Sequence, residues 1–123
     1  MINEHGTEIL KVDCCKGKVH DFELFKQSQL LIHPNTEIIV DLGYQGITKI
    51  HSNSKIPYKS SKKNKLTKEQ KKFNRQHSKR RIPVEHLIRK CKIFNIVKHT
   101  YRGKHKNYGL VWNIVAGLVN LKI

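Results

Sequence analysis

The spacing of apolar and polar residues changes along the chain, and each change marks a predicted element. Residues 7–15 alternate loosely and favour a strand. Residues 21–31 carry apolar side chains nearer to helical spacing, which predicts a helix with Asp21 as its N-cap. Pro34-Asn35 marks the end of that helical segment, because this pair is typical of turns.

The most strand-like run is residues 37–41, which is short, β-branched and apolar on both faces. Such a run predicts a strand in the centre of a covered sheet. Gly43 and Gly46 follow at once, as a tight turn requires. The order of strand, helix, buried strand and helix predicts an α/β fold.

The second half of the chain is dominated by helical signals. Residues 52–65 form a polar, lysine-rich loop, and Thr67-Lys68-Glu69-Gln70 is typical of a capping box that opens a helix. We expect this helix to run to about residue 81, and Pro83 to kink it or to begin a new helix. Two apolar stripes at helical spacing follow, over residues 84–94 and residues 111–119.

Composition and charge indicate which kind of molecule the chain binds. The chain has 123 residues, 37% of them hydrophobic, which suits one small packed domain rather than a disordered tail. Its formal net charge is +16. Residues 1–48 hold four basic and seven acidic residues, a net charge of −3, whereas residues 49–123 hold 21 basic and two acidic residues, a net charge of +19. This basic half predicts a polyanionic partner whose phosphates lysine and arginine neutralise.

The sequence disfavours membrane proteins and proteins with a structural zinc site. Three cysteines without a C-x-x-C pair are typical of reduced thiols. The longest apolar stretch, residues 110–123, is interrupted by polar residues and is too short to span a bilayer, so we expect a soluble cytoplasmic protein without membrane association. The cysteines and the eight histidines also lack the spacing of a structural zinc site.

Two acids are candidates for metal chemistry. Asp41 ends the predicted buried strand, and ligands of open α/β sheets bind outside the carboxyl ends of strands. An acid there is well placed to hold a divalent metal; the alternative is an aspartate that only starts the turn.

Glu85 is one of only two acids in the basic half. Arg81, Glu85 and Lys92 are spaced by four and by seven, so a continuous helix places them on one face. A carboxylate amid such charge stays ionised and can bind a metal. The alternative is an Arg81–Glu85 ion pair, worth about 0.3–0.5 kcal/mol on a solvated helix.

Short motifs follow one another along the chain: His20-Asp21-Phe22-Glu23-Leu24-Phe25-Lys26-Gln27-Ser28, Asp41-Leu42-Gly43-Tyr44-Gln45-Gly46, Leu66-Thr67, Phe73-Asn74-Arg75 and Arg81-x-x-x-Glu85-His86. Their order resembles the DDE-type transposases of the insertion-sequence 5 group and the harbinger-like DDE endonucleases. The spacing of Arg81, Glu85 and Lys92 is similar to the arginine–glutamate–lysine signature of insertion-sequence 4 and 5 enzymes. The resemblance extends from Thr7 to Leu121.

This resemblance implies a ribonuclease-H-like fold, a mixed sheet flanked by helices, in which three acids hold two Mg²⁺ (or Mn²⁺) ions. Asp41 corresponds to the second acid and Glu85 to the third, and two-metal chemistry requires their carboxylates to approach within about 4–8 Å. Arg81 and Lys92 correspond to the basic members of the signature and are expected to position Glu85 or the DNA end. The full-length enzyme is expected to bind transposon ends and to cleave and join DNA, with a homodimer as one option for its assembly.

The chain also departs from the family pattern. The family's first acid precedes a segment that corresponds to residues 1–3, and neither Asp13 nor Asp21 takes its place. The leading tyrosine of the signature, three residues before Arg81, is Ser78. We therefore expect a partial catalytic domain that lacks the first strand and the first acid, binds metal only with the complete triad and is inactive alone. Its parts are a strand-helix-strand core over residues 1–48, a basic loop over residues 52–65 and a helical part over residues 67–121.

Two alternatives remain open. A non-catalytic basic module would bind DNA or RNA through its phosphates, and an unstable remnant would have no function. Metal dependence separates an enzyme from a binding module, since phosphate binding by lysine and arginine needs no Mg²⁺. Cooperative unfolding separates both from an unstable remnant.

Overall fold

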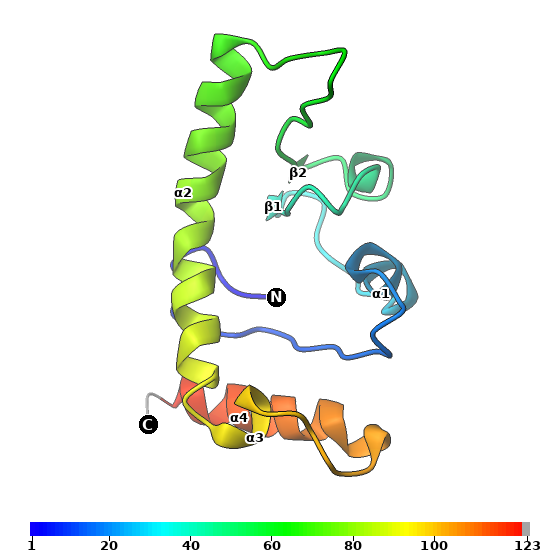
Figure 1. Cartoon of the computed structure of the whole chain (residues 1–123), viewed down its shortest axis with the longest axis vertical. Helices are drawn as coiled ribbons and strands as arrows, with labels where there is room; N and C mark the ends of the chain where they lie inside the picture. The colour runs from blue at the N-terminus through cyan, green and yellow to red at the C-terminus, as the bar shows by residue number, and fades with distance from the viewer. Residues whose placement is uncertain (122–123) are drawn as a thin grey trace. The chain divides into compact units, whose positions relative to one another are not determined.

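The computed structural model describes residues 1–121, which form two compact units. One unit consists of residues 15–81, and the other combines residues 1–14 with residues 82–121. Helix α2 (Lys68–Cys91) contributes residues to both units (Figure 1). The first unit also holds α1 (Asp21–Gln27), β1 (Ile38–Ile39), the 3-10 helix η1 (Ile47–Lys49) and β2 (Ser54–Lys55), and the second holds α3 (Asn95–Lys98), the 3-10 helix η2 (His105–Asn107) and α4 (Tyr108–Asn120).

The sheet of the first unit is a parallel pair. β1 pairs with β2 in the register of Ile38 with Ser54 and Ile39 with Lys55. Within the described residues this sheet has two strands, so β1 is not the central strand that its apolar run predicted. β2 lies inside the predicted loop of residues 52–65, which the polar composition concealed. The α/β class is confirmed in its coarse form, as a helix-rich chain with a small parallel sheet.

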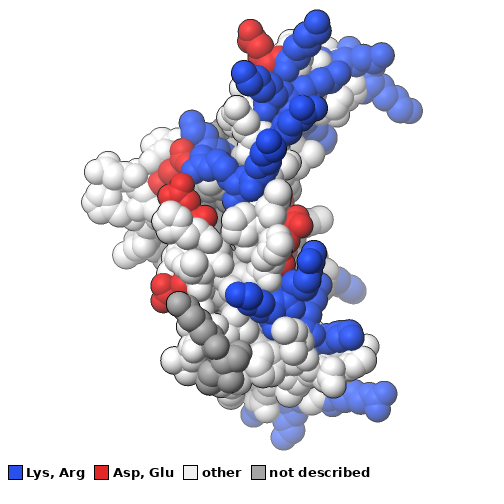
Figure 2. Space-filling model, turned by 90° about the vertical axis from the view of Figure 1, so that its left-hand side faces the viewer, with Lys and Arg blue, Asp and Glu red and all other residues white. Residues whose placement is uncertain are grey.

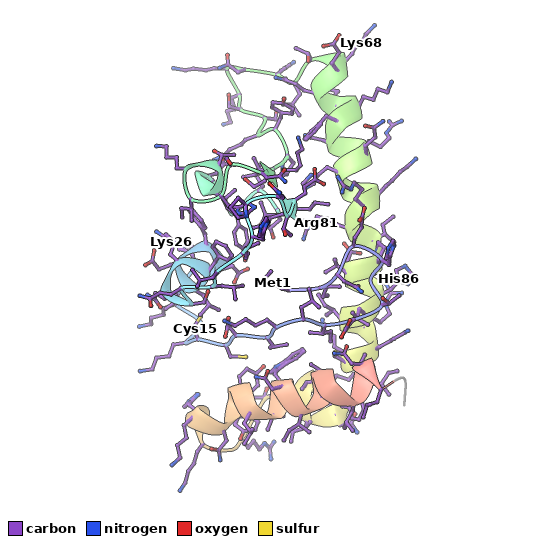
Figure 3. All side chains as sticks on the ribbon, turned by 180° about the vertical axis from the view of Figure 1, so that it is seen from behind. Met1, Cys15, Lys26, Lys68, Arg81 and His86 are labelled. Carbon is purple, nitrogen blue, oxygen red and sulfur yellow. The ribbon has the colours of Figure 1, made fainter. Side chains whose placement is uncertain are left out.

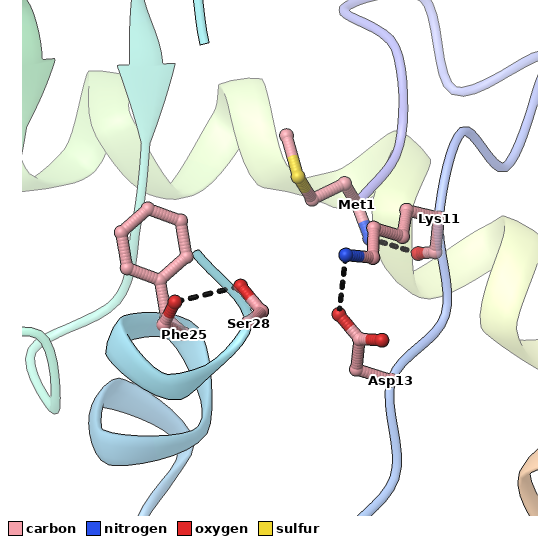
Figure 4. Close-up of polar contacts among 5 residues, drawn as sticks. All are labelled: Met1, Lys11, Asp13, Phe25 and Ser28. Carbon is pink, nitrogen blue, oxygen red and sulfur yellow. Dashed lines mark hydrogen bonds and ion pairs between the residues drawn. The ribbon is translucent and has the colours of Figure 1, made fainter. Parts of the chain in front are cut away.

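The strand predicted over residues 7–15 is wrong. This segment makes a single antiparallel bridge, between Ile2 and Ile9, and continues as irregular chain. The side chain of Asn120 explains the difference, because its amide accepts from the Ile9 N–H and donates to the Ile9 carbonyl, both at 2.8 Å. A strand on that edge of the segment would need those same two groups. On the other edge the Glu8 carbonyl and the Leu10 N–H already bond to Asn3 and Met1. Lys11 and Asp13 then form a local ion pair at 3.2 Å (Figure 4).

Helix α1 is shorter than predicted, since it ends at Gln27 rather than Leu31. The Ser28 hydroxyl donates to the Phe25 carbonyl at 2.7 Å (Figure 4), and Gln29 turns into the left-handed region with φ 47°. A left-handed residue just beyond the last turn is a common way for a helix to stop. The N-cap is the extended residue His20, so the prediction of Asp21 was wrong by one position.

The capping box predicted at the start of α2 is confirmed. The Thr67 N–H donates to Oε1 of Gln70 at 3.0 Å, and the Gln70 N–H donates to Oγ1 of Thr67 at 3.2 Å. These two bonds satisfy amide groups that have no acceptor within the helix.

Of the two alternatives at Pro83, the start of a new helix is wrong, because α2 continues through it to Cys91. A proline in a helix interior costs about 3 kcal/mol, so packing on either side must offset it. Part of that packing is close contact with Gly6, where an added Cβ would clash with Cβ of Pro83. Gly6 also has φ 61°, which glycine adopts without strain.

The core of the second unit joins α2, α3 and α4. Its buried members are Leu87, Cys91, Val97, Val115 and Val119. Both apolar stripes predicted from the sequence contribute to it, and the closing helix predicted over residues 111–119 is confirmed as α4. Burial raises the pKa of the Cys91 thiol. None of the helices in the described part of the chain combines the length and apolar character that crossing a membrane requires.

The capping box gives a test of how much α2 contributes to stability. We expect Thr67→Ala to lower the free energy of unfolding by about 1 kcal/mol, because the Gln70 amide loses its acceptor. Urea unfolding followed by circular dichroism measures the change. Thr100→Ala, at an exposed position outside the helices, is the control and should leave stability within about 0.5 kcal/mol. Equal effects of the two substitutions would contradict the role of the cap.

Candidate functional site

Asp41 lies two residues beyond β1 and starts a tight turn. Its carbonyl accepts from the Tyr44 N–H at 3.2 Å, and its Oδ1 accepts from the Gly43 N–H at 3.0 Å. A Cβ at residue 43 would lie 3.2 Å from that same oxygen, so glycine lets the carboxylate approach the backbone. The turn therefore fixes the orientation of the Asp41 carboxylate.

The second carboxylate oxygen of Asp41 faces Arg81 of α2. Nη2 of Arg81 lies 3.8 Å from Oδ2 of Asp41, and Figure 3 shows where Arg81 stands on the helix. The two side chains are 36% and 42% exposed, so water reaches the pair and its contribution to stability is about 0–1 kcal/mol. Asp41 thus starts the turn, as one reading of the sequence had it, and also presents a solvent-accessible oxygen.

Further contacts of α2 hold the chain next to Asp41. The ring of the buried residue His77 bonds through Nε2 to the Val40 carbonyl at 2.6 Å. A carbonyl oxygen only accepts, so Nε2 carries the proton. One turn further, Arg80 pairs with Glu37 at 2.5 Å. The strand that leads to Asp41 is therefore tied to the same helix face at successive turns.

Sequence reasoning missed His77 and the Arg80–Glu37 pair. The available signal was spacing: Phe73, His77 and Arg81 follow one another at four-residue intervals, which is one face of a helix. The ring centroids of Phe73 and His77 lie 6.0 Å apart, which agrees with that periodicity.

Tyr44 connects the turn to α1. Its ring packs on Phe22 at 5.7 Å and on Phe25 at 6.2 Å between centroids. Burial raises the pKa of Tyr44, and the negative charges of Asp21 and Asp41 add to the rise while Arg81 opposes it. Tyr44 therefore keeps its proton at neutral pH. The aromatic residues of the His20–Ser28 motif thus have a structural role, because they support the turn that begins with Asp41.

Glu85 belongs to the other unit and lies exposed on α2. The helix is continuous from Ser78 through Arg81 to Glu85, so the spacing of three and four residues places all three on one stripe. Lys92 follows the last helical residue, and its N–H donates to the Ile88 carbonyl at 3.1 Å, which extends the helical turn. The structure brings Arg81 to Asp41, and the ion pair considered between Arg81 and Glu85 is absent from the described residues. The approach of Asp41 to Glu85 stays a prediction.

Metal ligands are sparse in the described chain. Residues 1–121 contain no group of three or more histidine, cysteine or acidic side chains arranged to hold a metal ion. Asp41 offers a hard carboxylate oxygen on a partly exposed side chain, which is the donor type that Mg²⁺ and Mn²⁺ prefer.

Basic side chains gather around the N-terminal half of α2 and the loop before it (Figure 2). The exposed members of this basic surface are Lys59, Lys62, Lys63, Lys65, Lys68, Lys71, Lys72, Arg75 and Lys79. Glu69 is the acid that interrupts it.

The His77 contact predicts a specific stability effect. His77→Leu should lower the free energy of unfolding by about 1–3 kcal/mol, since the Val40 carbonyl is left buried without its donor. His86→Leu, at an exposed histidine of the same helix, is the matched control and should change stability by at most about 0.5 kcal/mol. Urea unfolding measures both. If His77→Leu proves as mild as the control, the helix is not held to β1 in this way.

Comparison with known proteins identifies the family of the chain. Residues 1–120 match the family model described as DDE superfamily endonuclease. The chain is 44% identical over 123 residues to a protein of Microchaete diplosiphon named as a probable transposase for insertion sequence element IS702. All of this chain is aligned, and it spans 45% of that protein's length. No solved structure matches. Because the family model covers nearly every residue, the chain belongs to the DDE superfamily endonucleases.

Proposed function

We propose that the chain is the C-terminal part of an insertion-sequence 5 group transposase, whose full-length form cleaves transposon ends and transfers the strands. The family match over residues 1–120 and the name of the 44%-identical relative support this proposal. The observation that carries it is the placement of Asp41, fixed after β1 and paired with the helix that also bears Glu85.

The proposed fold is a partial ribonuclease-H-like domain to which both compact units belong. The parallel pair of β1 and β2 supports it, since crossover connections between parallel strands are typical of α/β domains. The first acid of the triad is proposed to come from a part of the full-length enzyme outside these residues, because neither Asp13 nor Asp21 matches its motif.

Asp41 and Glu85 are the proposed metal ligands. Mg²⁺ is commonly held by one or two carboxylates together with water and substrate phosphates, so two acids fit that chemistry. The bound ions would activate a water or 3′-hydroxyl and stabilise the leaving oxygen. Asp41 contributes an oxygen whose direction is set by the Gly43 N–H.

Arg81 and Lys92 are proposed as positioning residues. Nη2 of Arg81 stands 3.8 Å from Oδ2 of Asp41, so the guanidinium faces the carboxylate and helps to orient it. A guanidinium also binds a phosphate through two parallel hydrogen bonds, so the same side chain is suited to orient the DNA end. Lys92, exposed just beyond α2, supplies a further positive charge for Glu85 or DNA.

A complementation assay tests the catalytic assignment. The chain is incubated with Mg²⁺ or Mn²⁺ and a DNA substrate that bears the element's ends. It is tested alone and together with a polypeptide equivalent to the part of the relative that the chain does not cover. We expect no cleavage by the chain alone and cleavage by the mixture, because the two-metal site needs the complete triad. Asp41→Asn or Glu85→Gln should each abolish the activity of the mixture.

Two controls make this assay specific. Glu69→Gln removes the other acid of the basic half, and Asp13→Asn removes an acid paired with Lys11; both should leave cleavage unchanged. Urea unfolding shows whether each variant is folded. Cleavage that survives both Asp41→Asn and Glu85→Gln would exclude this active site.

The basic surface favours DNA binding even without catalysis. The chain should bind duplex DNA in EDTA, with an affinity that falls linearly with salt on logarithmic axes at a slope of about −0.9 per phosphate contact. Fluorescence anisotropy between low and physiological salt measures this slope. DNA binding without metal-dependent cleavage in any mixture would instead favour the non-catalytic binding module. An affinity that barely responds to salt would contradict the electrostatic origin of binding.

A further inference from the structure

An open hollow lies beside the start of α2, away from Asp41 in the sequence. Its volume is about 470 Å³, within the range of roughly 300–1,000 Å³ that small-molecule sites occupy. The side chains that matter for its chemistry are Tyr58, Lys59, Lys63 and Lys65. None of the residues that line it is acidic. We name it the lysine hollow.

The walls of the lysine hollow are anchored to α2. The side chain of Asn74 accepts from the Tyr58 N–H at 2.8 Å and donates to the Tyr58 carbonyl at 3.0 Å. The ring of Tyr58 meets that of Phe73 edge to face, with 5.2 Å between centroids. The Phe73-Asn74 motif therefore holds Tyr58, and the capping box of Thr67 and Gln70 forms another part of the lining.

The chemistry of the hollow combines positive charge with an aromatic face. All three lysines are exposed, and Tyr58 is also accessible, with 48% of the residue exposed. Lysines alone would bind any polyanion through its phosphates. An accessible aromatic ring among them adds a surface on which an unpaired base can stack, which is how proteins hold single strands. A fully paired duplex keeps its bases stacked inside and offers none to the ring.

We propose that the lysine hollow binds the unpaired end of a DNA strand, with Lys59, Lys63 and Lys65 at its phosphates and a base stacked on Tyr58. This inference rests on the proposed function, because it takes DNA as the substrate. It adds a site separate from the candidate acids. Along α2, Gln70 of the hollow and Arg81 are separated by about 16 Å at 1.5 Å per residue, the length of roughly five base steps.

The test compares a blunt DNA duplex with the same duplex carrying a 3′ single-stranded extension of about eight nucleotides. Fluorescence anisotropy is recorded in EDTA, so that binding is independent of metal chemistry. We expect the extended duplex to bind more tightly. Tyr58→Leu should weaken its binding by about 10- to 100-fold and remove the preference, whereas Tyr58→Phe should retain it because the ring is kept.

The lysines are tested by their effect on the salt dependence. Lys63→Gln with Lys65→Gln should reduce the slope for the extended strand by about 1.4, since each single-strand phosphate contact contributes about 0.7. Lys16→Gln with Lys18→Gln makes the same change of charge at exposed positions outside the hollow and should leave the slope unchanged. These four lysines are exposed, so neither double variant threatens folding.

Several outcomes would overturn the proposal. Equal affinity for blunt and extended duplexes would do so, as would identical slopes for the two double lysine variants. Tighter binding of an RNA strand of the same sequence would assign the hollow to RNA instead. Binding to the hollow in EDTA depends on contacts to phosphates and to a base, so it needs no bound metal ion. The two proposals can therefore fail separately. If the mixture does not cleave DNA but the chain still prefers the extended duplex, the proposed cleavage function is rejected and the proposed binding site in the lysine hollow is supported.

Discussion

His77 donates from a buried ring nitrogen to the Val40 carbonyl at 2.6 Å, and the arrangement around Asp41 depends on this contact. The strand β1 has two residues and one partner strand among the described residues, too little pairing to hold its own position. A helix that binds the backbone carbonyl just before Asp41 supplies the missing restraint. Arg80 and Arg81 then meet Glu37 and Asp41 from the next turn, so a buried hydrogen bond sets the register for two partly exposed ion pairs.

The sequence could predict an interaction of this structure when the residues that form it lie close together along the chain. The capping box of Thr67 and Gln70 links residues three apart, so its signature is complete in the sequence and was predicted correctly. The failed strand over residues 7–15 was decided by Asn120, whose amide occupies both backbone groups of Ile9 from 111 residues away. The new helix that Pro83 offered as one alternative does not form, and the fit of Pro83 against Gly6 is equally invisible to a local pattern.

The same distinction between local and distant residues applies to the candidate site. Asp41 and its glycine turn were found from local sequence, since a strand, an acid and Gly43 are consecutive signals. The pairing of Arg81 with Asp41 spans forty residues, and spacing within the helix indicated only Glu85 as its partner. Asp41 and Glu85 as joint metal ligands remain a prediction, because they belong to separate compact units.

Burial of Cys91 has a practical consequence for work with this protein. The thiolate is the form that reacts with alkylating and oxidising reagents. Cys91 is 1% exposed and its pKa is raised, so both access and ionisation protect it. Cys15 is exposed. Maleimide dyes should therefore modify the chain near residue 15 while the interior thiol stays reduced, which gives a native handle for fluorescence without engineering the core.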